Sequence, residues 1–422
     1  MLNLNRLTNS AVTAGLQVVK KSTARLPARL RPRFSESSEN LLELASKASG
    51  LDDFGDPEFL PHYHSLIEAF RKEAELNVCG VAAAKRDVLN LLSGRLRLQE
   101  QLTSYPEIHE EPIEQPLIII GLPRAATTYL HGLLALDAAN RAPRNWEIMC
   151  PFPRPGSNAR TDRANIGKAA RGLWFFHRLT GNLHGKHRLA ARSPQEDIVI
   201  MSYAFQSIRF DSVYRLPQFQ AQQEKLDNTQ AYRWHKKFLQ HLQFGRPVKR
   251  WVLKAPAHLL SLESLLRVYP DARLVQINRD PAEFLPSLIG LTATMQSSFS
   301  ITRAREPLIH QVISRWQNTL NELTAKRSRL GLSDNRILDL SYREVTDKPI
   351  ATLEKIYSWM GWELSGDIKN TPVLQQSKRY TFQHSLSEIG IEVDDLHERF
   401  SDYIKTYLDS SCSSTGKHLV ER

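Results

Sequence analysis

Long apolar runs and cysteine are both scarce in this chain of 422 residues. No apolar run approaches the roughly 18–20 residues that a membrane-spanning helix needs, so we expect no such helix. The three cysteines, Cys79, Cys150 and Cys412, lie far apart and form no Cys-x-x-Cys pair. This usage argues against a disulfide framework and a zinc site, and it favours a reducing compartment, which we take to be the cytoplasm.

Acidic residues are absent from residues 1–35, a segment that contains seven basic residues. The formal net charge of +11 therefore falls by seven to +4 over the remaining chain, which fits a small anionic ligand and does not require nucleic acid. This basic arm has no apolar core typical of a secretory signal. It could be an amphipathic helix making peripheral membrane contact, a transit-type presequence, or a flexible, solvated arm.

Apolar residues recur at spacings of three and four between residues 36 and 110, which predicts a helical cap. After this cap, residues 111–410 alternate between short apolar runs and helical patterns. We expect strands at 116–121, 250–255, 272–278 and 335–342. We expect the intervening helices at 127–136, 258–268, from Pro281 onward, and at 349–362. The alternation predicts an α/β fold with a parallel sheet that helices flank on both faces. Pro286 lies inside one predicted helix and should bend it, which disfavours a regular helix there.

Each predicted strand ends in a polar loop. The loops contain Pro123 and Arg124, Lys254 and Pro256, Arg279 and Asp280, and Tyr342 and Arg343. In open parallel sheets the ligand crevice lies beyond the carboxyl ends of the strands. The four loops are therefore expected to converge on one anion.

The first of these loops, "GLPRAATT" at 121–128, resembles a phosphate-binding loop that has lost its lysine. The usual pattern is G-x-x-x-x-G-K-[ST], and here Ala126 replaces the second glycine and Thr127 replaces the lysine. Backbone N–H groups and the helix N-terminus can still hold one phosphate. The lysine that would contact a γ-phosphate is missing. The loop therefore predicts a nucleotide that has one 5′-phosphate and a transferable group other than a phosphoryl group. Such a loop suits a sulfotransferase better than a kinase.

Several blocks of sequence extend this likeness to a family. In order, they are "LDDFGD", "RAPRNWE", "SPQED", "LKAPAHL", "NRDPAEFLPSL" and "KRYTFQHSLSEIGI". With the loop, they make residues 40–408 resemble the large, mostly bacterial branch of the sulfotransferases that use 3′-phosphoadenosine 5′-phosphosulfate (PAPS). That branch has the loop G-x-P-R-[ST]-[GA]-T-T, from which Ala125 departs, and at the position of Ala126 glycine is the usual residue. Ala125 removes one hydroxyl, and Ala126 would be strained if its position needs a positive φ.

The resemblance implies roles for residues at the strand ends. Residues Pro123, Arg124, Ala125, Ala126, Thr127 and Thr128 would hold the 5′-phosphosulfate. Lys254 would steady the sulfuryl group and its leaving oxygen, where charge develops. Arg279 and Ser287 would bind the 3′-phosphate. An internal ion pair between Arg279 and Asp280 or Glu283, and a surface position for Lys254, are the structural alternatives.

Two further assignments concern the cofactor more loosely. Tyr342 is expected near the adenine. Lys378 and Arg379 lie in a block where relatives supply cations close to the cofactor, although a solvated pair is the alternative.

The general base has three candidates. Glu147 resembles the catalytic glutamate of the tyrosylprotein sulfotransferases, and nearby cations would favour its ionised form. His258 lies close to where small-molecule sulfotransferases have their catalytic histidine. Asp197 is the third candidate.

The sequence thus predicts an enzyme that moves a sulfuryl group from PAPS, as co-substrate, to a hydroxyl or an amine of an unidentified acceptor. We expect a small-molecule or lipid-like acceptor, no metal and no nucleic acid partner, because fixed cations suffice for a sulfuryl group and no clustered ligand set is evident. A non-catalytic nucleotide-binding protein on the same fold is the alternative that Ala125 and Ala126 suggest.

Overall fold

The structure is a computed structural model of the chain. It describes residues 26–150, 159–180, 189–302, 305–365 and 390–409, together with single residues 15, 23, 368, 371 and 386. The chain divides into two compact units. The helical unit comprises Met1–Pro112, Pro143–Pro247 and Leu291–Ala304, and the sheet unit comprises Ile113–Ala142, Val248–Gly290 and Arg305–Arg422. The boundaries predicted at residues 35 and 110 stay predictions.

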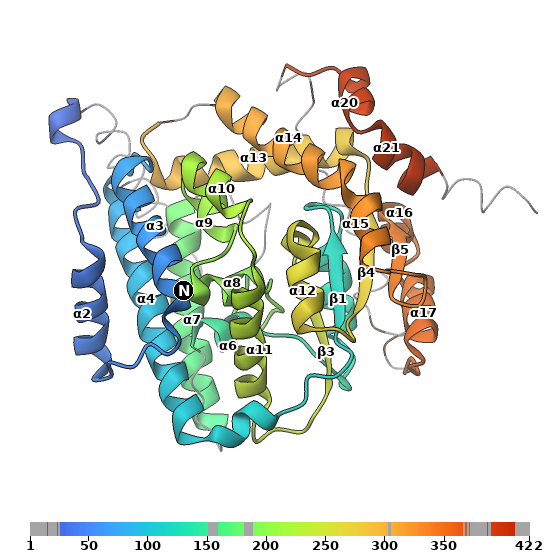
Figure 1. The fold of residues 1–422 in the computed structure, drawn as a ribbon, viewed down its shortest axis with the longest axis horizontal. Coiled ribbons are helices and arrows are strands. Elements are labelled where there is room, and N and C mark those ends of the chain that lie inside the picture. Colours follow the sequence, from blue (N-terminus) through green and yellow to red (C-terminus); the bar gives the residue numbers. More distant parts are fainter. Residues whose placement is uncertain are drawn as a thin grey trace, which may run out of the picture. The chain divides into compact units, whose positions relative to one another are not determined.

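The described part of the helical unit is built from helices (Figure 1). They are η1 (Ala28–Leu30), α2 (Ser38–Ser49), η2 (Pro57–Phe59), α3 (Leu60–Lys72), α4 (Val78–Ser104), η3 (Pro106–Glu110), α6 (Asn145–Met149), α7 (Ala159–Thr180), α8 (Ile198–Met201), η5 (Ser202–Ala204), α9 (Arg209–Val213), α10 (Pro217–Gln223) and α11 (Thr229–Gln243). Side-chain caps start α2 and α4: Ser37 accepts a hydrogen bond from the Asn40 N–H at 3.1 Å, and Asn77 accepts one from the Gly80 N–H at 2.9 Å.

A buried arginine lies at the centre of this unit. Arg95, on α4, is 1% exposed, and its guanidinium donates to the carbonyl oxygens of Phe54, Asp56 and Tyr203 at 2.7, 3.0 and 3.2 Å. The same group lies over the rings of Phe59 and Trp234, at 3.9 and 4.0 Å from their centroids. Burial lowers the pKa of Arg95 to about 9, so this side chain stays charged at neutral pH.

The sheet unit contains all five strands of the described chain. Its elements are β1 (Leu117–Gly121), α5 (Thr127–Leu134), β2 (Asn140–Arg141), β3 (Arg250–Lys254), η6 (Pro256–Ser261), α12 (Leu262–Val268), β4 (Arg273–Asn278), α14 (Arg305–Asn321), α15 (Leu323–Arg329), β5 (Ile337–Ser341), α16 (Tyr342–Asp347), α17 (Pro349–Met360), α20 (Val393–Arg399), α21 (Ser401–Ile404) and η8 (Lys405–Asp409). One further helix, α13 (Pro281–Phe299), begins in this unit and ends in the helical unit.

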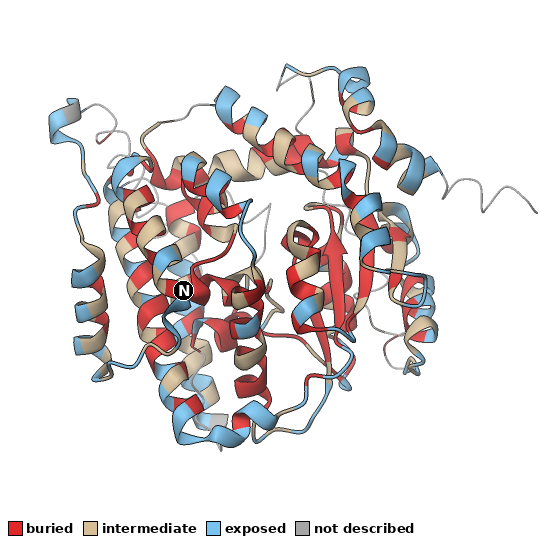
Figure 2. Ribbon diagram, viewed as in Figure 1, coloured by how far each residue is buried: buried red, intermediate tan, exposed pale blue. Residues whose placement is uncertain are grey.

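The strands form one parallel sheet in the order β2-β3-β1-β4-β5. All five residues of the central strand β1 are buried (Figure 2), as expected for a parallel strand covered on both faces. This confirms the α/β fold class and the parallel sheet that the alternating pattern predicts. The two-residue strand β2 was not predicted, because two residues carry no periodicity.

Pro286 does not interrupt its helix. The helix α13 runs from Pro281 to Phe299 with Pro286 inside it, so the helix continues through the proline, and the bend expected there stays a prediction. Pro286 is the sixth residue and removes only one backbone hydrogen bond, to the carbonyl of Ala282. The neighbouring Phe284 and Leu285 are fully buried, and their packing outweighs that loss.

Candidate functional site

The loop after β1 begins with a glycine that no other residue can replace without displacement. Gly121 has a φ of +125°, and a Cβ built on it would lie 2.5 Å from the Ile277 carbonyl oxygen of the neighbouring β4. The chain therefore turns sharply out of the sheet while remaining against β4. This close approach starts the loop 122–126 at the carboxyl edge of the two central strands.

Two later residues of this loop also have left-handed backbone. Arg124 has a φ of +64° and Ala126 a φ of +62°, and Ala126 directly precedes α5. The position that the sequence comparison singled out thus does have a positive φ, which costs a non-glycine residue about 1–2 kcal/mol. A left-handed residue before a helix also turns successive N–H groups toward one side, an arrangement that suits an anion.

The Arg124 side chain reaches toward α13. Its Nε donates to the Ser287 hydroxyl at 3.0 Å, and Ser287 is buried with 5% exposure. The Arg124 carbonyl oxygen accepts a hydrogen bond from Nη1 of Arg279, which follows β4. Three of the residues expected to bind the donor therefore form one connected group.

Lys254 joins the same loop from the other side. It ends β3 opposite Ile119 of β1, is 1% exposed, and donates from Nζ to the Thr128 hydroxyl at 3.0 Å. This contradicts the alternative of a surface lysine. Thr127 is buried and Thr128 exposed at the start of α5. The ends of β1, β3 and β4 thus bring Arg124, Lys254 and Arg279 around the same loop.

The guanidinium of Arg279 has several partners. It lies over the Tyr342 ring, 3.9 Å from its centroid, and its Nε is paired with the Glu283 carboxylate at 3.0 Å. The internal ion pair considered from the sequence therefore exists, with Glu283 rather than Asp280. Glu283 is about half exposed, so its carboxylate can be exchanged for another anion at low cost. Tyr342 contacts the arginine, and its place near an adenine stays a prediction.

A polar network behind Arg279 was missed by the sequence analysis. The buried Tyr403 hydroxyl of α21 donates to Oδ1 of Asn278 and accepts the Arg279 backbone N–H, each at 3.2 Å. Nδ2 of Asn278 donates to Asp339 of β5 at 3.1 Å. Burial raises the pKa of Tyr403 well above its usual value, so its hydroxyl keeps its proton. No spacing in the sequence connects residue 403 with residue 279.

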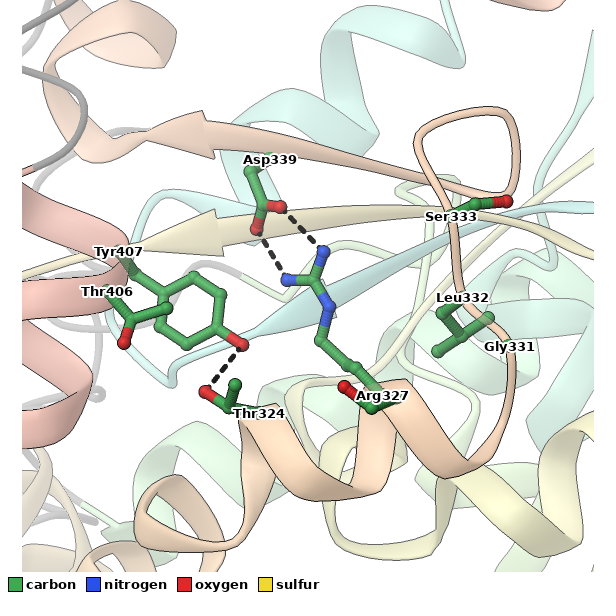
Figure 3. Close-up of a pocket in the computed structure, with 9 residues that line it drawn as sticks. Thr324, Arg327, Gly331, Leu332, Ser333, Asp339, Thr406 and Tyr407 are labelled. Carbon is green, nitrogen blue, oxygen red and sulfur yellow. Dashed lines mark hydrogen bonds and ion pairs between the residues drawn. The ribbon is translucent and has the colours of Figure 1, made fainter.

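Asp339 also forms a pair with an arginine on its other side. Arg327 of α15 donates two parallel hydrogen bonds to it, at 3.0 and 2.8 Å (Figure 3). The pair borders a cavity of about 650 Å³, where the Thr324 and Tyr407 hydroxyls lie 3.3 Å apart. The network therefore runs from this cavity through Asp339 and Asn278 to the backbone of Arg279.

The three candidate bases lie in different surroundings. His258 lies on η6 in the sheet unit and is 1% exposed. Glu147, in the helical unit, is 5% exposed and accepts the Arg144 backbone N–H at 2.9 Å, which caps its own helix α6. Asp197, in the same unit, is fully buried, 3.9 Å from Nε2 of His235. All three side chains are buried, and which of them is the general base stays open.

Two of the remaining predicted site residues lie in the loop after β1. Pro123 is half-buried and Ala125 fully buried in the loop after β1. Lys378 and Arg379 lie outside the described residues. Within the described ranges, no three His, Cys, Asp or Glu side chains are grouped as a metal site would require. No helix in those ranges is both long and apolar enough to cross a membrane.

Comparison with known proteins identifies the family of this chain. A model of the sulfotransferase family matches residues 116–366, which include all five strands and the residues Arg124, Lys254, Arg279 and Ser287. The chain belongs to the sulfotransferase family. This agrees with the resemblance found in the sequence, and it makes the chain an enzyme of sulfuryl transfer.

Individual sulfotransferases agree in sequence and in fold. Omega-hydroxy-beta-dihydromenaquinone-9 sulfotransferase Stf3 of Mycobacterium bovis is 25% identical over 288 residues, which cover 65% of this chain and 70% of that protein. The crystal structure of sulfotransferase STF1 from Mycobacterium tuberculosis H37Rv matches with a TM-score of 0.77 at 26% identity, over 88% of this chain and 100% of the other. The crystal structure of sulfotransferase STF9 from Mycobacterium avium agrees in fold, with a TM-score of 0.76 at 24% identity, over 88% of this chain and 97% of the other.

Proposed function

We propose that this sulfotransferase moves a sulfuryl group from PAPS to a hydroxyl, or an amine, of a small-molecule or lipid-like acceptor. The observation that carries this proposal is the cluster at the carboxyl edge of the sheet. Arg124, Lys254 and Arg279 come from three strand ends and meet at one loop through hydrogen bonds to Ser287, Thr128 and the loop backbone.

The residues of the cluster suit the two charged ends of this donor. The N–H groups between Arg124 and Thr128 and the two threonine hydroxyls would hold the 5′-phosphosulfate, next to the start of α5. Arg279 and Ser287 would hold the 3′-phosphate, and the phosphate would replace the Glu283 carboxylate on Arg279. The loop itself contains no carboxylate. A carboxylate there would repel such an anionic ligand.

Chemistry at this site would need charge stabilisation and a base. In the transfer, the bond between sulfur and the 5′-phosphate oxygen breaks, a bond between sulfur and the acceptor oxygen forms, and the acceptor proton passes to the base. Lys254 would stabilise the charge left on the phosphate oxygen, a role worth about 3–4 kcal/mol in comparable sites. Glu147 is our first candidate for the base and His258 the second.

The acceptor is inferred from a relative. Stf3 is named for a menaquinone-derived substrate with a hydroxyl at the end of a long apolar chain. This name supports a lipid-like alcohol for the present chain as well. The cytoplasmic location stays a prediction.

Transfer of radiolabelled sulfate from PAPS to a panel of isoprenoid and other lipid alcohols tests the proposal. We expect label in at least one alcohol, and we expect Lys254→Ala to lower kcat by a factor of about 100–1,000. Lys355→Ala is the matched control, because Lys355 is half-exposed on α17 and paired only with Glu344 among the described residues. Binding of PAPS without transfer to any alcohol of the panel would contradict the proposed class of acceptor.

A further inference from the structure

The helix α7 of the helical unit has two contrasting faces. Its inner face packs Ala169 and Leu173 against Trp146 and Ala191, all at most 8% exposed. Its outer face carries exposed residues at spacings of three to five from Arg160 to Trp174, together with the adjacent Phe175, and we call this surface the α7 face. The α7 face comprises Arg160, Arg163, Lys168, Arg171, Trp174 and Phe175.

The α7 face is strongly basic. Along Ala159–Thr180 there are five basic residues and one acidic residue, Asp162, which gives a net charge of +4. Asp162 is paired with Arg246 at 3.5 Å, so its carboxylate is already engaged. Among the described residues, neither Lys168 nor Arg171 forms an ion pair. The charges of Lys168 and Arg171 are therefore not neutralised by described carboxylates.

Large apolar side chains lie at one end of the same face. Trp174 is 47% exposed and Phe175 43% exposed, although residues of this kind are usually buried. Met149 of α6 is 42% exposed and lies beside α7, since a Cβ built on Gly172 would be 3.1 Å from its Cε. The Arg178 guanidinium lies 5.2 Å from the Trp174 ring centroid. An apolar tip next to cations is thus presented to solvent.

We propose that the α7 face docks the protein on an anionic lipid bilayer. A helix that lies in a membrane interface combines Trp or Phe on its apolar side with Lys and Arg that meet lipid phosphates, as this face does. Exposed aromatic and apolar groups would enter the interface, while the cations remain at the headgroups. The inference stands on the helical unit alone and does not depend on the proposed donor or acceptor.

Co-sedimentation of the full-length protein with vesicles tests this proposal. With vesicles of 70% phosphatidylcholine and 30% phosphatidylglycerol, we expect binding that weakens as salt is raised. Lys168→Gln with Arg171→Gln should lower partitioning about 25-fold, about fivefold for each lost charge. Trp174→Ser with Phe175→Ser should lower it about tenfold or more. The matched control is Lys47→Gln with Lys72→Gln, two exposed lysines of α2 and α3 that should change nothing.

Three results would overturn the proposal. The first is a wild-type protein that stays in solution with these vesicles. The second is full binding by both α7 variants together with loss of binding when Lys20, Lys21 and Arg25 of the basic arm become Gln. The third is an α7 face whose charge variants lose affinity for RNA or DNA while vesicle binding is unaffected. Circular dichroism of each variant confirms folding, which exposed substitutions should leave intact.

Discussion

Arg95 in the helical unit and Arg279 in the sheet unit show two uses of the same side chain. Arg95 is 1% exposed, donates to three backbone carbonyl oxygens and lies between two aromatic rings. Arg279 has a side chain that is 18% exposed, bonded to one carbonyl oxygen and to a half-exposed carboxylate, and it covers one ring. Both are cations held by hydrogen bonds and aromatic faces.

The difference lies in what surrounds the charge. The partners of Arg95 are backbone atoms that cannot leave, so its charge stabilises the loop 54–56 and has no capacity for a ligand. The carboxylate on Arg279 is a side chain that can turn into solvent, which leaves the guanidinium able to bind an anion. The number of arginines in a unit therefore indicates less about ligand binding than the kind of partners each one has.

Removing Arg95 gives the largest effect that this comparison predicts. Arg95→Met should lower the free energy of unfolding by about 3–5 kcal/mol, because one buried and two partly buried carbonyl oxygens lose their donor. Chemical denaturation followed by circular dichroism measures the change. Arg86→Met is the control, since Arg86 is exposed on the same helix and should cost less than about 0.5 kcal/mol. Equal stability of the two variants would show that Arg95 is not a structural cation.

Tyr403→Phe tests whether the network behind Arg279 positions that arginine for ligand binding. The variant keeps the ring but loses the hydroxyl that holds Asn278 and the Arg279 backbone. We expect KM for the donor to rise about fivefold, about 1 kcal/mol, with kcat at saturating donor unchanged. Steady-state kinetics at varied PAPS measures both. A fall in kcat with unchanged KM would contradict a positioning role. Tyr105→Phe, which changes an exposed tyrosine of the helical unit, is the control.

Ala126→Gly tests whether the backbone of the loop is strained, and its expected effect is the smallest of the three. Glycine accepts a φ of +62° without strain, so the variant should gain about 0.5–1 kcal/mol of stability despite its more flexible unfolded chain. Ala325→Gly, at an exposed helical position of α15, should lose a similar amount. Thermal unfolding of both variants measures whether each change raises or lowers the stability of the protein. Destabilisation by both changes would mean that the left-handed backbone at 126 carries no strain.

The sheet was predictable because its strands are short apolar runs that end in polar loops. The runs at 117–121 and 273–278 are almost fully buried, and such strands show plainly in a sequence. The same pattern located Arg124, Lys254 and Arg279 at strand ends, since carboxyl ends of parallel strands share one edge. Local sequence could not show that buried neighbours would hold a proline inside α13.

The support behind Arg279 could not be predicted for a different reason. Tyr403 lies 124 residues after Arg279, and its hydrogen bonds exist only because α21 packs in the sheet unit. In the sequence, Asp339 looks like any partly exposed strand residue, and only the structure reveals its two partners, Asn278 and Arg327. Residues that act through other residues leave no motif in one sequence.

Binding of adenosine 3′,5′-bisphosphate by isothermal titration calorimetry tests the central claim most directly. If the strand-end cluster holds the doubly phosphorylated nucleotide, Arg279→Ala should weaken binding at least tenfold, since a charged hydrogen bond to phosphate is lost. Arg329→Ala, which removes an exposed arginine of the same unit, should bind like the wild type. Equal affinity of wild type and Arg279→Ala would contradict the account.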